Sequence, residues 1–279
     1  MNKESPLCMD IDNLESLVVS GYRDGNIKLF NFDNNRLNLF QDIPKNSNMN
    51  EISNPITGVA VINRKLFVTA DFSGNVMIYT GTGQFTCINQ KRILEGPIYD
   101  MSYFVEKEQV KLYLGCDKGY LYIVTFNENN LQDINVTGGK VHNFGLTSVS
   151  VNKLLCVTCG IDSKVKFTLN NTLSFKNDDV SDLFKDLEFG SEPATTVCVT
   201  KDNNFNRNFI AIGYSSGQLV ILEYHQSGEY TSEIFQLGSP IKSLKWGKSG
   251  FGLTVCYGNN EYKAFAITEE SKFEEISFK

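Results

Sequence analysis

The stretch that decides the fold of this chain reads Val68-Thr-Ala-Asp-Phe-Ser-Gly-Asn-Val-Met-Ile-Tyr79. It contains a run of small and apolar residues, a tight polar turn around Gly74, and a second run that is nearly all apolar or aromatic. Two such runs joined by a short turn that contains glycine predict a β-hairpin. Five similar stretches occur along the chain: Val18–Phe30, Tyr113–Val124, Val157–Phe167, Ala211–Leu222 and Thr254–Phe265.

The turn positions of these hairpins recur with a period in the forties. They are Gly25, Gly74, Gly119, Ser163, Gly217 and Asn260, at spacings of 49, 45, 44, 54 and 43 residues. A period of this length with one hairpin per repeat is typical of a β-propeller, in which each repeat forms a four-stranded blade. The sequence therefore predicts an all-β, six-bladed propeller of the WD40 type in a single domain. The expected blades cover approximately residues 6–45, 54–95, 96–138, 145–176, 194–238 and 239–279.

Each repeat also supplies the two other strands of a blade. A short inner strand is expected before each hairpin, as in Ile241–Trp246, and a more polar outer strand after it, as in Phe273–Phe278. The four glycines at the hairpin turns are expected to have a positive φ, which glycine adopts without a steric penalty.

Composition and charge exclude several classes of protein. The net charge of −6 and the pI near 5.1 argue against a nucleic-acid scaffold, because phosphate binding needs clustered Lys and Arg. No apolar run approaches the roughly 18 residues of a membrane span, so direct membrane insertion is not expected. The N-terminal residues carry no apolar signal-peptide region. Seven cysteines, scattered along the predicted strands, fit a reducing compartment better than a disulfide framework, which indicates a cytoplasmic protein.

The two ends of the sequence predict a ring that is not latched within the chain. Only about five residues precede the first inner strand, and the sequence ends on an outer strand. Exposed sheet edges and apolar faces are normally covered, and another chain could cover them by adding a blade. A partner segment of about three strands is therefore expected between the first and last blades. The residues expected to contact it are Met9, Ile11, Val18 and Ile27 in the first blade and Ile241, Leu244, Trp246 and Val255 in the last. Trp246 has a second interpretation as an ordinary core residue.

The sequence offers few residues for catalysis or metal binding. Cys156 and Cys159 form a Cys-x-x-Cys motif, but residues three apart in a strand point to opposite faces, so both are expected to be buried strand residues. His142 and His225 are interpreted as surface or loop residues. Gly81-Thr-Gly-Gln84 lacks the Gly-Lys-Ser/Thr ending of a phosphate loop and is interpreted as a turn. The chain is therefore expected to be no enzyme and to hold no cofactor and no metal.

One insertion interrupts the period. Residues 177–192 lie in the longest gap and carry six acidic residues and one lysine, with Val180, Leu183, Phe184 and Leu187 at helical spacing. The segment is interpreted as a surface helix that packs its apolar stripe on the rim of a blade. The alternative is an acidic docking loop.

The order of these segments resembles the Sec-thirteen family of WD-repeat proteins along nearly the whole chain. Ser20–Phe30 and Asp71–Tyr79 look like the first two WD hairpins, and Lys118–Asn129 resembles the third blade of that family. Ile241-Lys-Ser-Leu-Lys-Trp-Gly-Lys-Ser-Gly-Phe-Gly-Leu253 resembles its last blade, Val/Ile-x-x-x-x-Trp-x-x-x-Gly-x-x-Leu. The usual Gly-His and Trp-Asp marks of WD repeats are missing.

The resemblance implies an open six-bladed propeller with a structural role. In that family a partner chain donates a seventh blade. The partner is a Sec-thirty-one-like protein in the outer cage of COPII vesicles, which carry protein from the endoplasmic reticulum to the Golgi, or a helical nucleoporin in the Y-shaped scaffold of the nuclear pore. The sister nucleoporin Seh-one is also open and six-bladed. A different function stays open, in which a WD-repeat adaptor latches its own ring and presents proteins or peptides on its top face.

Overall fold

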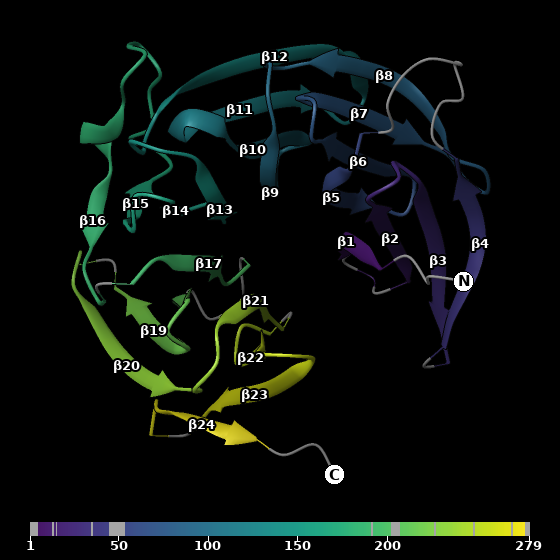
Figure 1. The fold of residues 1–279 in the computed structure, drawn as a ribbon. Coiled ribbons are helices and arrows are strands. Elements are labelled where there is room, and N and C mark those ends of the chain that lie inside the picture. The colour runs from purple at the N-terminus through teal and green to yellow at the C-terminus, as the bar shows by residue number, and fades with distance from the viewer. Residues whose placement is uncertain are drawn as a thin grey trace. The chain divides into compact units, whose positions relative to one another are not determined.

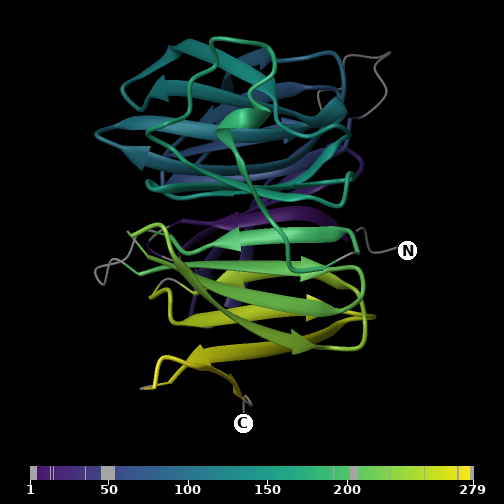
Figure 2. The ribbon, with the colours of Figure 1, turned by 90° about the vertical axis from the view of Figure 1, so that its left-hand side faces the viewer.

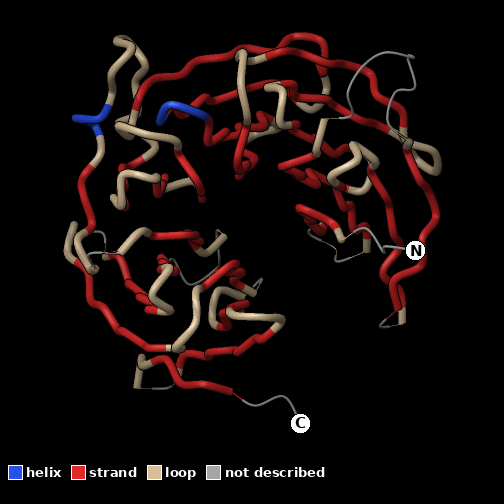
Figure 3. Tube along the Cα trace, in the orientation of Figure 1, coloured by secondary structure: helices blue, strands red, loops and turns tan. Residues whose placement is uncertain are grey.

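Six four-stranded antiparallel sheets follow one another along the chain, so the protein is a six-bladed β-propeller, as predicted (Figure 1). The computed structural model describes residues 5–12, 14, 16–34, 36–44, 54–190, 192–201, 207–225, 227–247, 249–268 and 270–276. The predicted blade boundary at Lys45 and the end of the predicted outer strand at Phe278 lie outside these residues. Within them the only helical segments are two short 3-10 turns, η1 (Asp117–Gly119) and η2 (Ser181–Leu183), drawn in blue in Figure 3.

The chain divides into two compact units. The first unit comprises Met1–Asp117 and Tyr122–Thr137, and the second comprises Lys118–Leu121 and Gly138–Lys279. Each holds three blades and is described by itself.

The first unit contains blades 1 to 3. Blade 1 consists of β1 (Pro6–Ile11), β2 (Leu17–Tyr22), β3 (Ile27–Asp33) and β4 (Arg36–Ile43). Blade 2 consists of β5 (Ile56–Asn63), β6 (Leu66–Asp71), β7 (Asn75–Thr80) and β8 (Thr86–Arg92). Blade 3 consists of β9 (Ile98–Glu106), β10 (Gln109–Cys116), β11 (Tyr120–Asn127) and β12 (Asn130–Lys140).

The second unit contains blades 4 to 6, and Figure 2 views it from the side of the outer strands β16 and β20. Blade 4 consists of β13 (Leu146–Val151), β14 (Leu155–Gly160), β15 (Val165–Leu169) and β16 (Lys185–Leu187). Blade 5 consists of β17 (Ala194–Val199), β18 (Asn208–Tyr214), β19 (Gln218–Tyr224) and β20 (Tyr230–Gln236). Blade 6 consists of β21 (Ile241–Trp246), β22 (Gly252–Tyr257), β23 (Glu261–Ile267) and β24 (Phe273–Ile276).

Every sheet is built from four consecutive strands, so no sheet combines strands from the beginning and the end of the described chain. The blades are therefore not closed by pairing between the first and last sheets. Many propellers latch their ring in that way, and this one does not within the described residues.

The acidic insertion has a different structure from the one predicted. It forms η2 and then β16, which pairs with β15 as the outer strand of blade 4, beyond residue 176 where that blade was expected to end. Val180, Phe184 and Leu187 are buried, as the predicted apolar stripe requires, but Leu183 is 36% exposed, and the four residues belong to a turn and a strand and not to a helix. Ser191 lies outside the described residues.

The four glycine turns have the positive φ that the sequence predicted, and the turns at Ser163 and Asn260 share it. The φ angle is positive at all six turn positions: Gly25 84°, Gly74 86°, Gly119 83°, Ser163 63°, Gly217 84° and Asn260 64°. Serine and asparagine therefore occupy the left-handed region in blades 4 and 6, which L residues adopt only at some cost in free energy. This shared conformation is what makes the six hairpins equivalent despite their different sequences.

Side chains alternate between the two faces of each sheet, and apolar faces of neighbouring sheets pack together. In β18, Ile210 and Ile212 belong to the core shared with blade 4, whereas Phe209 and Ala211 belong to the core shared with blade 6. This alternation is the period-2 pattern of a strand that is buried on both faces.

Neighbouring inner strands do not pair through their backbones, and side chains connect them instead. Asp10 Oδ2 accepts the N–H of Val61 at 3.0 Å, which connects β1 to β5. Ser150 Oγ accepts the N–H of Val199 at 2.9 Å, which connects β13 to β17. These hydrogen bonds bridge 51 and 49 residues of sequence, one blade repeat, so they fix each sheet against the next.

Gly74 is a turn position at which the structure clearly predicts the effect of adding a side chain. A Cβ added there would lie 2.3 Å from the carbonyl oxygen of Leu94 and 2.9 Å from that of Gly96, in addition to the strain of the positive φ. We expect Gly74→Val to lower the free energy of unfolding by about 2 kcal/mol. Gly83→Ala is the matched control, because nothing lies within 4 Å of a Cβ at that position. Thermal and urea unfolding measure both variants, and an unchanged melting temperature for Gly74→Val would contradict the turn geometry.

Candidate protein-interaction surfaces

The residues predicted to contact a partner in blade 6 lie on the face that packs against blade 5. Ile241, Leu244, Trp246 and Val255 are all buried in one core with Phe209, Ala211 and Ile221 of blade 5. The sequence showed that this face was apolar but not which sheet it meets. In this structure the four side chains are core residues between blades 5 and 6, which corrects their assignment to an exposed face.

Trp246 illustrates the correction. Its indole N–H donates to the carbonyl oxygen of Cys198 at 2.9 Å, and its ring stacks on Phe209 with centroids 5.6 Å apart. The second interpretation of Trp246, as a core residue, is therefore the one that the structure supports.

The predicted residues of blade 1 divide between its two faces. Ile27 packs toward blade 2 in one core with Leu29, Ile56 and Phe67. Met9, Ile11 and Val18 lie on the other face: Ile11 and Val18 are cross-strand partners in one row, which continues to Phe30 and Leu39.

This second face of blade 1 is an apolar sheet surface open to solvent. We call it the blade 1 free face and define it as Met9, Ile11, Val18, Phe30, Phe32, Leu37 and Leu39. Four of these side chains are well exposed: Met9 57%, Leu37 55%, Leu39 53% and Phe32 37%. Exposed apolar side chains clustered on one sheet face are typical of an interaction site.

The outward face of blade 6 has a different character. Lys245, Thr254, Cys256, Tyr262 and Ile276 are exposed on it. It mixes polar and apolar groups in every row. On the free face of blade 1 the row of Met9 also contains Ser20 and Lys28, but the row of Ile11, Val18, Phe30 and Leu39 is entirely aliphatic and aromatic. The apolar surface is therefore the stronger candidate site.

A buried histidine network in blade 4 was missed by the sequence prediction. His142 is 1% exposed and not a surface residue. Its Nδ1 lies 2.9 Å from Asp162 Oδ1 and its Nε2 lies 2.9 Å from Thr158 Oγ1. Because an ionised carboxylate can only accept, Nδ1 carries a proton toward Asp162. The network ties the loop before β13 to β14 and to the hairpin turn, so its role is structural.

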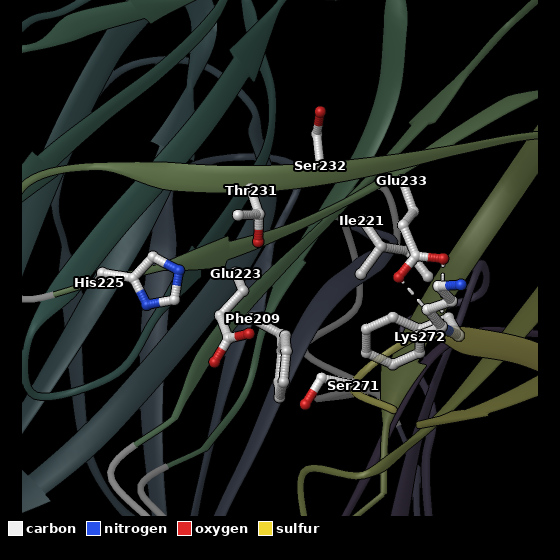
Figure 4. A pocket seen from close by; sticks show the side chains of 10 residues that line it. Phe209, Ile221, Glu223, His225, Thr231, Ser232, Glu233, Ser271 and Lys272 are labelled. Carbon is white, nitrogen blue, oxygen red and sulfur yellow. Dashed lines mark hydrogen bonds between the residues drawn. The ribbon is translucent and has the colours of Figure 1, made fainter. Parts of the chain in front are cut away.

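His225 is exposed, as predicted, and lines a groove between blades 5 and 6 (Figure 4). The groove has a volume of about 410 Å³, with Phe209, Ile221 and Phe273 among its apolar lining residues. Both carboxylate oxygens of Glu233 accept the main-chain N–H of Phe273, at 3.1 and 3.2 Å, as the dashed lines in Figure 4 show.

The second carboxylate of this groove is also engaged. Glu223 accepts two hydrogen bonds from the guanidinium of Arg207, at 2.7 and 2.6 Å, and Arg207 lies over the ring of Phe209. The contact of Glu233 with Phe273 connects β20 of blade 5 to β24 of blade 6, whereas the pair of Glu223 and Arg207 lies within blade 5. No sequence motif could identify the groove, because its residues come from four strands and two turns.

The cysteines of the Cys-x-x-Cys motif are buried on opposite faces of β14, as predicted. Cys159 lies in the core shared with blade 5, and burial raises the pKa of the Cys156 thiol above its usual range. Among the residues that the structure describes, no group of three or more His, Cys, Asp or Glu side chains could hold a metal ion. None of the described helical segments is long and apolar enough to cross a membrane.

No protein-family model matches this chain, and no curated protein matches it.

The carboxyl group of Asp162 makes the blade 4 network sensitive to acid. Burial raises the pKa of this carboxyl, but hydrogen bonds from His142 and from the N–H groups of Asn143 and Lys164 outweigh burial and lower the pKa to about 2. The unfolded chain binds this proton more tightly than the folded chain. The stabilisation is therefore fully present above pH about 4 and is lost as the pH falls toward 2, a change of about 2 kcal/mol.

We expect Asp162→Asn to lower the free energy of unfolding at pH 7 and to flatten its decline between pH 4 and 2. Urea unfolding at several pH values measures both effects. Asp133→Asn, at an exposed position, serves as the control and should retain the wild-type profile. If Asp162→Asn and wild type lost stability in parallel below pH 4, the network would not be the source of the acid sensitivity.

Proposed function

We propose that this chain is a non-catalytic scaffold subunit that takes a sheet from a partner protein onto the blade 1 free face. The observation that carries the proposal is the exposure of Met9, Leu37 and Leu39 on a sheet that is covered by a neighbour on its other face. A partner sheet would bury these side chains as blade 2 buries Ile27 and Leu29.

The assembly that suits this role follows from the resemblance to the Sec-thirteen family. It is the COPII coat on vesicles derived from the endoplasmic reticulum, where the partner is a Sec-thirty-one-like protein, or the Y-complex of the nuclear pore, where the partner is a helical nucleoporin. The coat places the chain in the cytoplasm, peripheral on vesicles, and the Y-complex places it at the nuclear pore. The net charge of −6 is consistent with partners that are proteins and not nucleic acids.

A second candidate function is a WD-repeat adaptor that binds proteins or peptides through hairpin turns. Phe144 and Ile161 favour it, because they are 62% and 59% exposed at one end of blade 4. The N–H of Ile161 donates to the carbonyl oxygen of Gly145 at 2.9 Å, which holds the two segments together. Two exposed apolar side chains make a smaller site than the free face of blade 1, so the scaffold function is preferred.

Co-expression tests the scaffold function. The full chain is produced with the blade-forming segment of a Sec-thirty-one-like protein, and separately with that of a helical nucleoporin, each from the same genome. We expect one segment to co-purify and to raise the melting temperature, because it buries the exposed apolar face. Met9→Glu and Leu39→Glu should each weaken binding at least tenfold, since they place a charge in an apolar interface.

Ile234→Glu is the matched control, because Ile234 is 56% exposed on the outer strand of blade 5. It should leave binding unchanged. Binding that is lost in Phe144→Glu or Ile161→Glu but retained in Met9→Glu would replace the scaffold function with the adaptor function. Failure of both segments to bind, or self-association of the chain through the free face, would contradict the proposal.

A further inference from the structure

The junctions between inner strands follow a rule that concerns the fifth and sixth residues of each inner strand. Where the sixth residue is aliphatic, its main-chain N–H donates a hydrogen bond to the side chain of the fifth residue of the preceding inner strand. Val61 is bonded in this way to Asp10, and Val199 to Ser150. These junctions join blade 1 to blade 2 and blade 4 to blade 5.

Where the sixth residue is an aromatic donor, the bond runs in the opposite direction. The hydroxyl of Tyr103 donates a hydrogen bond to the carbonyl oxygen of Val61. The indole N–H of Trp246 donates a hydrogen bond to the carbonyl oxygen of Cys198. The fifth residues of the preceding strands are here Ala60 and Cys198, which lack a hydroxyl or carboxylate. All four junctions inside the two units therefore contain a side-chain to main-chain hydrogen bond, made by one mode or the other.

The sixth residue of β1 is Ile11, which is aliphatic and belongs to the blade 1 free face. The N–H of Asp12 donates to the carbonyl oxygen of Leu17 at 3.0 Å. Hydrogen-bonded pairs alternate along an antiparallel ladder, so the N–H of Ile11 points away from β2. The same geometry occurs in blade 5, where the N–H of Thr200 bonds to Phe209 and the N–H of Val199 is left for Ser150.

We infer that the partner strand that docks beside β1 carries a Ser, Thr, Asn or Asp whose side-chain oxygen accepts the main-chain N–H of Ile11. The inference rests on the proposed function and specifies its partner. An aliphatic residue at that position of the partner would leave the N–H buried without an acceptor, which proteins avoid.

A double-mutant cycle tests the inference with the segment that binds in the co-expression test. Each Ser, Thr, Asn and Asp of that segment is replaced by Ala, and its affinity is measured for the full wild-type chain and for Ile11→Pro. Proline removes the N–H and is tolerated where an edge N–H faces away from its sheet. One replacement should weaken binding at least tenfold to the wild-type chain but less than twofold to Ile11→Pro.

Ile11→Val is the control: it keeps the N–H, so the tenfold effect should persist. Hydrogen exchange on the wild-type complex gives a second measurement that does not depend on the folding of Ile11→Pro, and the amide of Ile11 should exchange at least a hundredfold more slowly when the segment is bound. A segment that binds the free face without any coupled residue and without protection of this amide would overturn the inference and leave the proposed function intact. Absence of binding would overturn the proposed function itself.

Discussion

The need to cover both faces of every sheet is the constraint on which the rest of this structure depends. A strand whose side chains are apolar on both faces of its sheet has two faces to bury. Blade 5 meets this requirement inside its unit, since Ile210 and Ile212 face blade 4 while Phe209 and Ala211 face blade 6. Blade 1 meets it on one face only, through Ile27 and Leu29. Its free face exposes Met9, Leu37 and Leu39, and this exposure directs the functional interpretation.

Burial of apolar surface does not by itself fix one sheet against the next, because the hydrophobic effect is not directional. The hydrogen bonds from side chain to main chain between inner strands are directional, and they can fix the position of one sheet against the next. Each connects a defined atom of one blade to a defined atom of the next, as Asp10 does with Val61. At the outer end of the same junction, the amide of Gln41 both donates to and accepts from the main chain of Phe85, at 2.9 and 2.8 Å. Apolar packing thus supplies most of the stabilisation, and these bonds determine the arrangement.

The sequence predicted the repeats, the sheets and the turn conformation because these are local properties. A hairpin needs a positive φ at one position, and Gly25 can be recognised there from the residues on either side, whereas the positive φ of Ser163 was seen only in the structure. Which face of a sheet meets which neighbour is a non-local property. The sequence identified Leu244 and Trp246 as residues of an inner strand, but it could not tell that they pack against blade 5.

The two other errors have the same origin. Lys185–Leu187 is too short, and its surroundings too acidic, to be recognised as a strand without β15 beside it. His142 lies sixteen residues before Thr158 and twenty before Asp162, and only the folded blade brings the three together. In both cases the informative contact joins segments that no short sequence window contains.

The interchangeable modes of the inner junction explain how such a chain keeps its fold with few sequence marks. A serine or aspartate can accept the next N–H, or a tyrosine or tryptophan on the next strand can donate back to a carbonyl oxygen, and either arrangement closes the junction. No single residue type is therefore required at these positions. The His142 network likewise forms although the Gly-His and Trp-Asp pairs of standard WD repeats are missing from the sequence. Each junction needs a donor on one inner strand and an acceptor on the next. These two residues lie about one blade repeat apart in the sequence, so they do not form a short motif that a sequence comparison could detect.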